Sequence, residues 1–252
     1  MSATDPTIQQ LRDLLFKARK VVVFTGAGIS TESGIPDFRS PGGIWSKYKP
    51  IEFHDFLRSE EMRRESWRRK FKTDQVVSAA KPNNGHRAIA LLNKNGLVSS
   101  VITQNIDGLH QLSGISDEQI IELHGNGTYA ACLSCHKRIE LKEVRQLFEL
   151  DEQLPACEAC GGIIKTATIS FGQPMPEAEL LRAEKETLAC DVFFVIGSSL
   201  VVYPAAGLPI MAKRNGARLI ILNREPTELD LHADLVLNRE IGPTLAILTN
   251  PQ

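Results

Sequence analysis

Hydrophobic residues along this chain gather in short runs that are separated by amphipathic stretches. The β-favouring runs predict buried strands at 21–24, 97–102, 120–123, 191–196, 218–222 and 233–237. Apolar residues at helical spacing predict helices at 8–15, 86–93, 140–150 and 177–188, with further helices ending near Lys213 and starting at Gly242. This alternation predicts an α/β fold with a doubly wound, mostly parallel, Rossmann-like sheet.

Two stretches interrupt the alternation and predict a smaller inserted module. Residues 40–81 lack strand patterning and contain both tryptophans, which predicts a loop followed by short helices. The main sheet is expected to resume with a strand at 166–171. We therefore expect a discontinuous Rossmann-like domain formed by 1–40, 82–127 and 166–252. The small domain would consist of a loop and helical insertion at 41–81 and a zinc-ribbon module at 128–165.

Four of the five cysteines form two Cys-x-x-Cys pairs, Cys132 with Cys135 and Cys157 with Cys160. Two pairs at this separation predict a tetrahedral four-thiolate site for one Zn²⁺. Four unrelated buried cysteines, or a redox motif, account less well for the spacing and the trailing glycines. A closed thiolate shell leaves no position for a substrate, so we expect the zinc to be structural. Cys190 is expected to be a small core residue.

The first predicted strand ends in a glycine turn, Gly26-Ala27-Gly28. Such a turn lets a diphosphate approach the main chain. The dinucleotide fingerprint requires a third glycine where Thr31 stands, so a strand-to-helix connection without a ligand is the alternative. The trio Asp37-Phe38-Arg39 favours a ligand, because packing does not require an acid, an aromatic residue and a base in succession. Trp45 is a further candidate for lining a pocket.

Polar groups follow other predicted strands as well. Gln104, Asn105 and Asp107 follow the second strand, His124 follows the third, and Gly197-Ser198-Ser199 follows the fourth. The carboxyl ends of strands in an open α/β sheet form the edge where ligands bind. His124 is followed by glycines and has an ordinary pKa of about 6.5, so it can act as a base. A structural hydrogen-bonding role is the alternative for this histidine.

Charge and hydropathy restrict the partners. Lys and Arg total 29 against 30 Asp and Glu, so the chain has no overall basic field for nucleic acid. The basic run at 63–72 is most simply a solvated helix face, and docking of acidic partners is the alternative. The chain has no apolar run long enough to span a membrane, and the first twenty residues resemble an amphipathic helix rather than a secretion signal. We expect a cytoplasmic protein with no membrane or nucleic-acid partner.

Together these stretches resemble the sirtuins of bacterial and archaeal type, which are NAD-dependent protein-lysine deacylases. The resemblance runs from about Lys20 to Gly242. It rests on GAGIS at 26–30, GIPDFR at 34–39, TQNIDGLH at 103–110, HG at 124–125, the paired cysteines, FG at 171–172, GSSL at 197–200 and N-x-E at 223–225. It implies a monomeric enzyme that transfers an acyl group from lysine to ADP-ribose with release of nicotinamide. NAD would be the co-substrate and one Zn²⁺ would be structural.

The resemblance also implies roles for individual residues. The catalytic residues would be His124, as the base, and Asn105. The residues expected around NAD are Gly26, Ala27, Gly28, Ser30, Ile35, Asp37, Phe38, Arg39, Trp45, Gln104, Asn105, Ile106, Asp107, Gly197, Ser198, Ser199, Asn223, Arg224, Glu225 and Ile241. The residues expected to contact an acylated-lysine protein or peptide are Ile106, Ile169, Phe171, Gly172, Val202, Trp67 and Lys70. Acetyl-CoA synthetase is one such protein by family resemblance alone.

The chain departs from the family pattern in three places. Gln173 stands where Glu commonly follows Phe-Gly, and Ser198 replaces the usual Thr. Members that prefer succinyl or malonyl lysine carry a Tyr-x-x-Arg pair, and the nearest match here runs from Trp67 to Lys70. Lysine is not a bidentate fork and tryptophan has no hydroxyl, so we expect a preference for uncharged acyl groups.

Two other functions are compatible with these motifs. Mono-ADP-ribosyl transfer to protein uses the same co-substrate, although a positioned His124 is chiefly useful when a ribose hydroxyl must attack. A non-catalytic zinc adaptor that senses NAD is a candidate from a different class.

Overall fold

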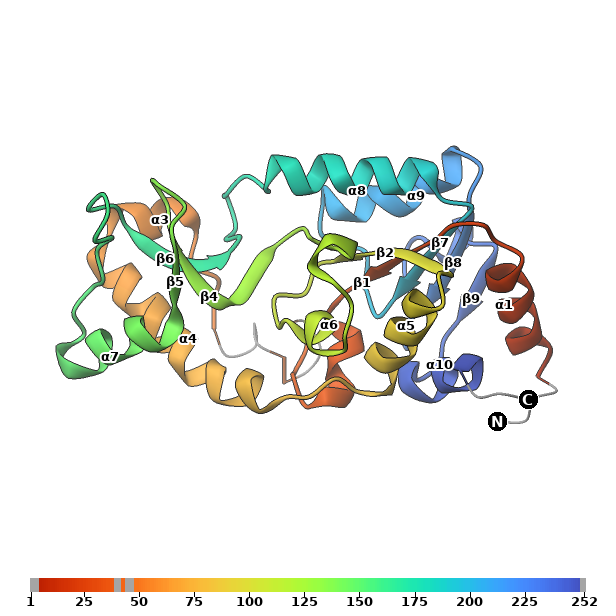
Figure 1. The fold of residues 1–252 in the computed structure, drawn as a ribbon, viewed down its shortest axis with the longest axis horizontal. Coiled ribbons are helices and arrows are strands. Elements are labelled where there is room, and N and C mark those ends of the chain that lie inside the picture. The colour runs from red at the N-terminus through yellow and green to blue at the C-terminus, as the bar shows by residue number, and fades with distance from the viewer. Residues whose placement is uncertain (1–4, 39–41, 44–47, 250–252) are drawn as a thin grey trace.

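The computed structural model describes residues 5–38, 42–43 and 48–249, which form a larger and a smaller unit side by side (Figure 1). The strands of the larger sheet are β1 (Val21–Thr25), β2 (Val98–Thr103), β3 (Ile120–Glu122), β7 (Val192–Ile196), β8 (Arg218–Leu222) and β9 (Leu235–Leu237). Their spatial order is β3-β2-β1-β7-β8-β9, and all neighbouring pairs are parallel. The order in which strands are added reverses between β1 and β7, which is where open α/β sheets bind ligands.

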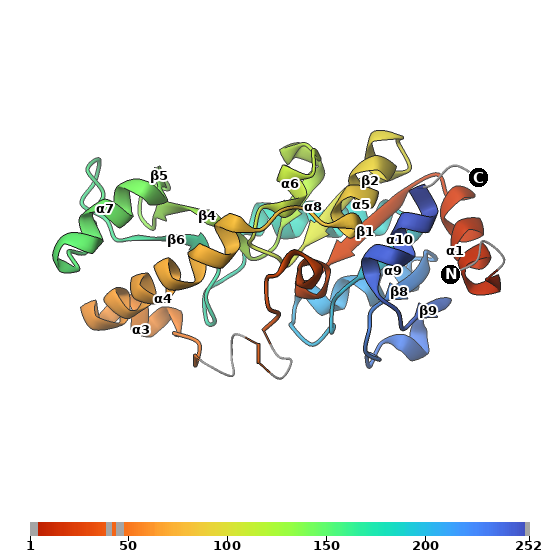
Figure 2. The ribbon, with the colours of Figure 1, turned by 90° about the horizontal axis from the view of Figure 1, so that it is seen from below.

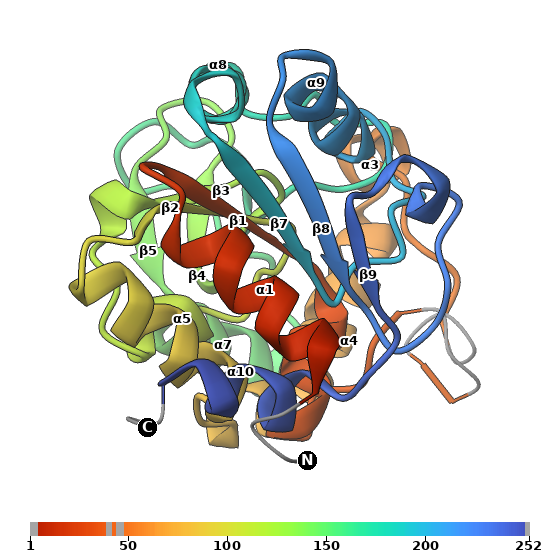
Figure 3. The same ribbon diagram turned by 90° about the vertical axis from the view of Figure 1, so that its right-hand side faces the viewer.

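Helices cover both faces of this sheet, and β1 shows why. Val21 and Val23 pack into the core on one face, while Val22 and Phe24 pack into the core on the other. The first face is covered by α1 (Pro6–Phe16), α5 (Asn84–Lys94) and α10 (Ile241–Thr249), and the second by α8 (Glu177–Ala189) and α9 (Leu208–Arg214) (Figure 3). The predicted doubly wound parallel sheet is confirmed.

Short elements complete the larger unit. They are α6 (Leu109–Leu112) and the 3₁₀ helices η1 (Ala27–Ser33), η2 (Asp117–Gln119), η3 (Ala205–Gly207) and η4 (Asp230–His232). Within the described residues, no helix combines the length and apolar character needed to cross a bilayer.

In its described residues the smaller unit contains an antiparallel sheet and three helices. Its strands β4 (Gly125–Cys132), β5 (Arg138–Glu140) and β6 (Ile164–Thr168) have the order β5-β4-β6. The helices α3 (Phe53–Arg58), α4 (Glu60–Ala79) and α7 (Leu141–Asp151) lie at the opposite end of the molecule from α1 and α10 (Figure 2).

Two details of this unit correct the predictions from sequence. The strand expected at 166–171 as part of the main sheet is β6, which pairs with β4 in the small sheet. An apolar run does not specify its partner, and β6 lies beside β4 because the chain returns from the cysteine module next to it. The second correction concerns α4, a single helix of 20 residues rather than a short one. Its mostly charged sequence buries only Trp67 and Phe71, which conceals the helical period.

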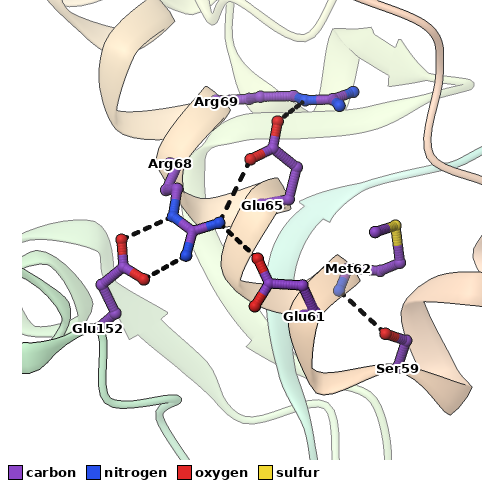
Figure 4. A network of polar contacts seen from close by, with 7 residues as sticks. All are labelled: Ser59, Glu61, Met62, Glu65, Arg68, Arg69 and Glu152. Atoms are coloured by element: carbon purple, nitrogen blue, oxygen red, sulfur yellow. Dashed lines mark hydrogen bonds and ion pairs between the residues drawn. The ribbon is translucent and has the colours of Figure 1, made fainter.

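Arg63, Arg64, Arg68, Arg69 and Lys70 of α4 form ion pairs with carboxylates of the small unit, several of them on the exposed face of the helix. Figure 4 shows Arg68 at the centre of this network. Its guanidinium donates to both carboxylate oxygens of Glu152, at 2.6 Å for the Nε–Oε1 bond, and to Glu61 at 2.7 Å. Arg68 holds the pKa of the Glu152 carboxyl below its usual value. The network ties α4 to the carboxyl end of α7.

Aromatic side chains form the core of the small unit. Trp67 is 1% exposed and stacks on Phe71 with ring centroids 5.5 Å apart, and Phe71 contacts Phe148 at 5.7 Å. These rings join α4 to α7 behind the cysteine-bearing strand, since Cys132 belongs to the same core cluster.

We predict that Trp67→Ala lowers the free energy of unfolding by about 3–5 kcal/mol, because it removes a fully buried indole and leaves a cavity. Urea unfolding followed by circular dichroism measures this change. Leu150→Ala, on α7 but 81% exposed, is the control and should change stability by less than about 0.5 kcal/mol. Equal effects of the two substitutions would contradict this account of the core.

Candidate functional site

A cavity of about 970 Å³ lies at the carboxyl edge of the large sheet, where that edge meets the small unit. Segments that follow β1, β2, β3, β7, β8 and β9 line it, together with residues 168–175 beyond β6. The predicted site residues that line it are Gly26, Ala27, Gly28, Asp37, Phe38, Gln104, Asn105, Ile106, His124, Ile169, Phe171, Gly172, Gly197, Ser198, Ser199, Val202, Asn223, Arg224, Glu225 and Ile241. The cavity therefore brings together most of the residues that sequence reasoning selected.

Two glycine loops meet at the floor of the cavity, one after β1 and one after β7. The Gly28 N–H donates to the Gly197 carbonyl at 2.8 Å. A Cβ on Gly28 would lie 2.8 Å from the Gly197 Cα, and a Cβ on Gly26 would lie 2.8 Å from the Gly197 oxygen. Neither position has room for a side chain, so bare main chain faces the cavity at the point where the strand order reverses.

Polar side chains after β2 donate hydrogen bonds to serines that follow β7 and β1. Gln104 Nε2 donates to Ser198 Oγ at 2.8 Å, and Asn105 Nδ2 donates to Ser30 Oγ at 3.2 Å. Ser30 Oγ in turn donates to Asp107 Oδ2 at 2.6 Å. Burial raises the pKa of the Asp107 carboxyl, although its hydrogen bond from Ser30 acts in the opposite direction. The hydrogen bonds from Asn105 to Ser30 and from Ser30 to Asp107 fix the orientation of the Asn105 amide at the cavity wall.

A second series of buried hydrogen bonds joins the carboxyl ends of β1 and β2. Thr25 Oγ1 donates to Thr103 Oγ1 at 2.8 Å, and Thr103 Oγ1 also accepts from the Asn105 N–H at 3.0 Å. His110 Nε2 lies 2.9 Å from Thr25 Oγ1, so this nitrogen carries the proton that Thr25 accepts. Burial lowers the pKa of His110 to about 3 and that of neighbouring His86 to about 4. Both imidazoles are neutral at pH 7.

His124 lies between the two units, directly after β3 and before β4. Its Nδ1 is 3.1 Å from the Gln104 carbonyl, which can only accept a hydrogen bond. Nδ1 therefore carries the proton, and the lone pair of Nε2 is free to accept another. Burial lowers the pKa of His124, partly opposed by the bond to the Gln104 carbonyl, so the imidazole is neutral at pH 7. A neutral imidazole with a free Nε2 can act as a general base.

The four paired cysteines form a metal site outside the cavity. The Sγ atoms of Cys132, Cys135, Cys157 and Cys160 all lie within 4.8 Å of one another. The separation is 3.5 Å between Cys132 and Cys160 and 3.6 Å between Cys135 and Cys157. Four thiolates at these separations fit one tetrahedral Zn²⁺, and a fully protein-bound shell is typical of a structural site.

Other predicted residues lie away from the cavity lining. Ser30 and Asp107 are buried behind it and act on Asn105, while Ile35 is buried without lining it. Arg39 and Trp45 lie outside the described residues. The prediction that Trp67 and Lys70 contact substrate is corrected: Trp67 is in the core of the small unit, and Lys70 pairs with Asp74 at 2.8 Å. Both side chains face elements of the small unit because α4 packs there.

Sequence reasoning missed several residues that line the cavity. They include Thr31, Glu32, Thr168, Ser170, Met175, Leu180, Tyr203, Arg239 and Glu240. Arg239 and Glu240 could have been found by the rule that located the others, since they follow the last strand of the sheet. Met175 and Leu180 carry no local signal, because their place in the lining depends on how the two units pack.

We predict one Zn²⁺ per chain, lost in Cys135→Ser because a hydroxyl is a poor replacement for a thiolate ligand. Metal analysis of the purified protein measures this stoichiometry. Cys190→Ser is the control, because Cys190 is buried in the core of the large unit and should leave the zinc content unchanged. Full zinc occupancy in Cys135→Ser would contradict the four-cysteine assignment.

We predict that the His124 imidazole titrates below pH 6.5. Burial disfavours the charged form of the imidazole, so the neutral form persists to lower pH in the folded protein than in the unfolded chain. The contribution of His124 to the free energy of unfolding is therefore lost as the pH falls below 6.5. Proton-carbon NMR across pH 4–8 measures the midpoint, with His124→Gln to assign the resonance. A midpoint at or above 6.5 would contradict the prediction.

A model of the Sir2 family matches residues 26–204. NAD-dependent protein deacetylase 1 of Bradyrhizobium diazoefficiens is 57% identical over 238 residues, which cover 94% of this chain and 93% of the relative. NAD-dependent protein deacylase 2 of Archaeoglobus fulgidus is 42% identical over 239 residues, covering 94% and 93%.

Solved structures agree with the sequence matches. A structure described as Sir2-p53 peptide-NAD+ aligns with a TM-score of 0.84 at 36% identity, covering 94% of this chain and 95% of the other. One described as Sir2Tm bound to a propionylated peptide aligns with a TM-score of 0.83 at 36% identity over the same shares. Since the family model spans most of the chain and close relatives cover nearly all of it, the chain belongs to the Sir2 family.

Proposed function

We propose that this protein is an NAD-dependent protein-lysine deacetylase or deacylase, which moves the acyl group from lysine to ADP-ribose and releases nicotinamide. The observation that carries the proposal is the position of His124. The His124 side chain, whose Nδ1 is bonded to the Gln104 carbonyl and whose Nε2 can accept a proton, lines the same cavity as the two glycine loops. A base and a main-chain surface for a diphosphate thus share one cavity. The names of the relatives, NAD-dependent protein deacetylase and deacylase, support this activity.

NAD would bind along the carboxyl edge of the sheet. The loops Gly26–Gly28 and Gly197–Ser199 present main chain with small or no side chains, which a diphosphate could approach closely. Asn223, Arg224 and Glu225 follow β8 and would contact the adenosine ribose. When bound, NAD supplies a ribose carbon from which nicotinamide departs. His124 Nε2 would accept a proton from a ribose hydroxyl, and the held amide of Asn105 would orient the same sugar.

An acyl-lysine peptide would enter from the junction of the two units. Residues 169–172 and 200–204 offer two edges for an added strand, which binds through main-chain hydrogen bonds and tolerates many flanking sequences. The acyl group would meet the apolar side chains of Ile106, Phe171 and Val202, which line the cavity. Among the described lining residues the arginines are Arg224 and Arg239, which follow β8 and β9, whereas Ile106 follows β2 on the other side of β1 and β7. This supports a preference for uncharged acyl groups.

The zinc would hold the small unit in shape and take no part in the reaction, because all four ligand positions belong to cysteines. Use of these cysteines as metal ligands rather than as disulfides supports a reducing, cytoplasmic location. A monomeric state remains our proposal from the sequence.

The test is an assay of acetyl-, propionyl- and succinyl-lysine peptides with and without NAD, read by mass spectrometry. We expect NAD-dependent deacylation with release of nicotinamide, faster on the acetyl and propionyl peptides than on the succinyl peptide. His124→Ala should lower turnover about 10²- to 10⁴-fold while NAD affinity changes little, because a general base is lost. His232→Ala, on exposed η4, is the control.

Other outcomes would favour other functions. Label from NAD retained on a protein target, with no deacylated peptide, would indicate mono-ADP-ribosyl transfer. NAD binding without nicotinamide release in the wild type would indicate an adaptor. Faster removal of succinyl than of acetyl from the same peptide would overturn the proposed acyl preference.

A further inference from the structure

One peptide group, the one between Thr168 and Ile169, is held at both of its polar atoms. The Ile169 N–H donates to the His124 carbonyl at 2.8 Å. The Thr168 carbonyl accepts a hydrogen bond from the ammonium of Lys165. This group is the last of β6 and the first of the segment 169–172 that lines the cavity. It therefore connects the predicted peptide-binding edge with the main chain of the predicted catalytic base.

Lys165 is unusual among the charged residues described in the structure. Lys165 is only 4% exposed. Among the described residues, no carboxylate forms an ion pair with its ammonium group. The polar partners of Nζ are the carbonyls of Thr168 and, at 3.4 Å, Thr166, while the Phe56 ring lies 5.9 Å away. Burial lowers the pKa of Lys165 to about 8. A buried ammonium without a counter-charge is costly, so its position is explained by the carbonyls it binds.

The strand end that Lys165 holds has no freedom to move independently of His124. Gly125, the residue after His124, has φ +71°, and a Cβ there would lie 2.0 Å from the Ala167 carbonyl oxygen. The main chains of β6 and of the His124 segment are therefore in direct contact. A shift of the Thr168 peptide group would displace His124 as well.

We propose that Lys165 is a positioning residue that holds the peptide-binding edge, residues 169–172, in register with His124. This inference rests on the proposed function. The ammonium donates a charge-assisted hydrogen bond to the Thr168 carbonyl, which polarises the peptide group and strengthens donation by the Ile169 N–H. With the Thr168 carbonyl and the Ile169 N–H both engaged, an added substrate strand would pair with main-chain groups beyond this peptide group.

The kinetic test compares Lys165→Met and Lys165→Arg with wild type. Lys165→Met removes the donor and should lower kcat/KM for an acetyl-lysine peptide by about tenfold or more, while NAD affinity measured by calorimetry changes less than about twofold. Lys165→Arg keeps a cationic donor and should restore most of the peptide kcat/KM. Lys213→Met is the control, because Lys213 is a partly buried lysine on α9 that pairs with Asp234.

An equal kcat/KM in Lys165→Met and Lys213→Met would overturn the proposal. Equal losses of NAD affinity and peptide kcat/KM would also overturn it, because they would indicate a general structural role. If Lys165→Met does not fold, Lys165→Leu, which also lacks a donor, takes its place with the same criteria.

A second measurement does not depend on turnover. Amide hydrogen exchange should be about tenfold faster for Ile169 in Lys165→Met than in wild type, because its hydrogen bond to His124 weakens. The Leu123 amide, which donates to the Thr103 carbonyl at 3.0 Å on the other side of His124, should be unchanged. Unchanged exchange at Ile169 would refute the link even in an active enzyme. Absence of wild-type deacylation would instead refute the proposed function and leave the exchange result valid.

Discussion

The parallel pairing of β1 with both β2 and β7 is the constraint on which the site depends. Each residue of β1 has a register partner on β7, and Thr25, Thr103 and Ile196 end their strands side by side. The segments that follow these strands must leave the sheet at one edge. Since helices cover both faces, that edge is the one place where main-chain N–H groups and polar side chains can face a ligand.

The smaller unit completes this edge rather than forming a separate site. The chain crosses from β3 in the large sheet to β4 in the small sheet through Leu123 and His124, so the imidazole stands at the junction. The return crossing follows β6 and adds residues 169–172 to the cavity lining, where Ile169 is hydrogen-bonded to the His124 carbonyl. Three features fix the shape of the small unit, which carries these crossings: the aromatic core around Trp67, the Arg68 network and the cysteine cluster. They therefore affect the cavity without lining it.

Local chemistry decided which features could be predicted from sequence. The apolar runs of β1 and β7, the glycine turns and the cysteine pairs each carry their signal within a few residues, and the structure brings them together as expected. The sheet to which β6 belongs could not be predicted, because the residue pattern within a strand does not specify its partner. The same reason explains the error at Trp67 and Lys70: a motif match in a charged helix does not say which side of that helix packs inward. The role proposed for Lys165 could not be predicted from sequence, because its polar partners are backbone carbonyls, which every residue carries.

The mutual approach of the two glycine loops limits how this protein can change over evolutionary time. A Cβ at Gly28 would meet Gly197, and a Cβ at Gly197 would lie 2.4 Å from the Ile29 nitrogen. A side chain at either position is therefore blocked by the backbone of the opposite loop, and substitution of one glycine does not make room for substitution of the other. Variation that diversifies the activity of this chain is therefore excluded at these two glycines and must arise at other positions of the cavity lining.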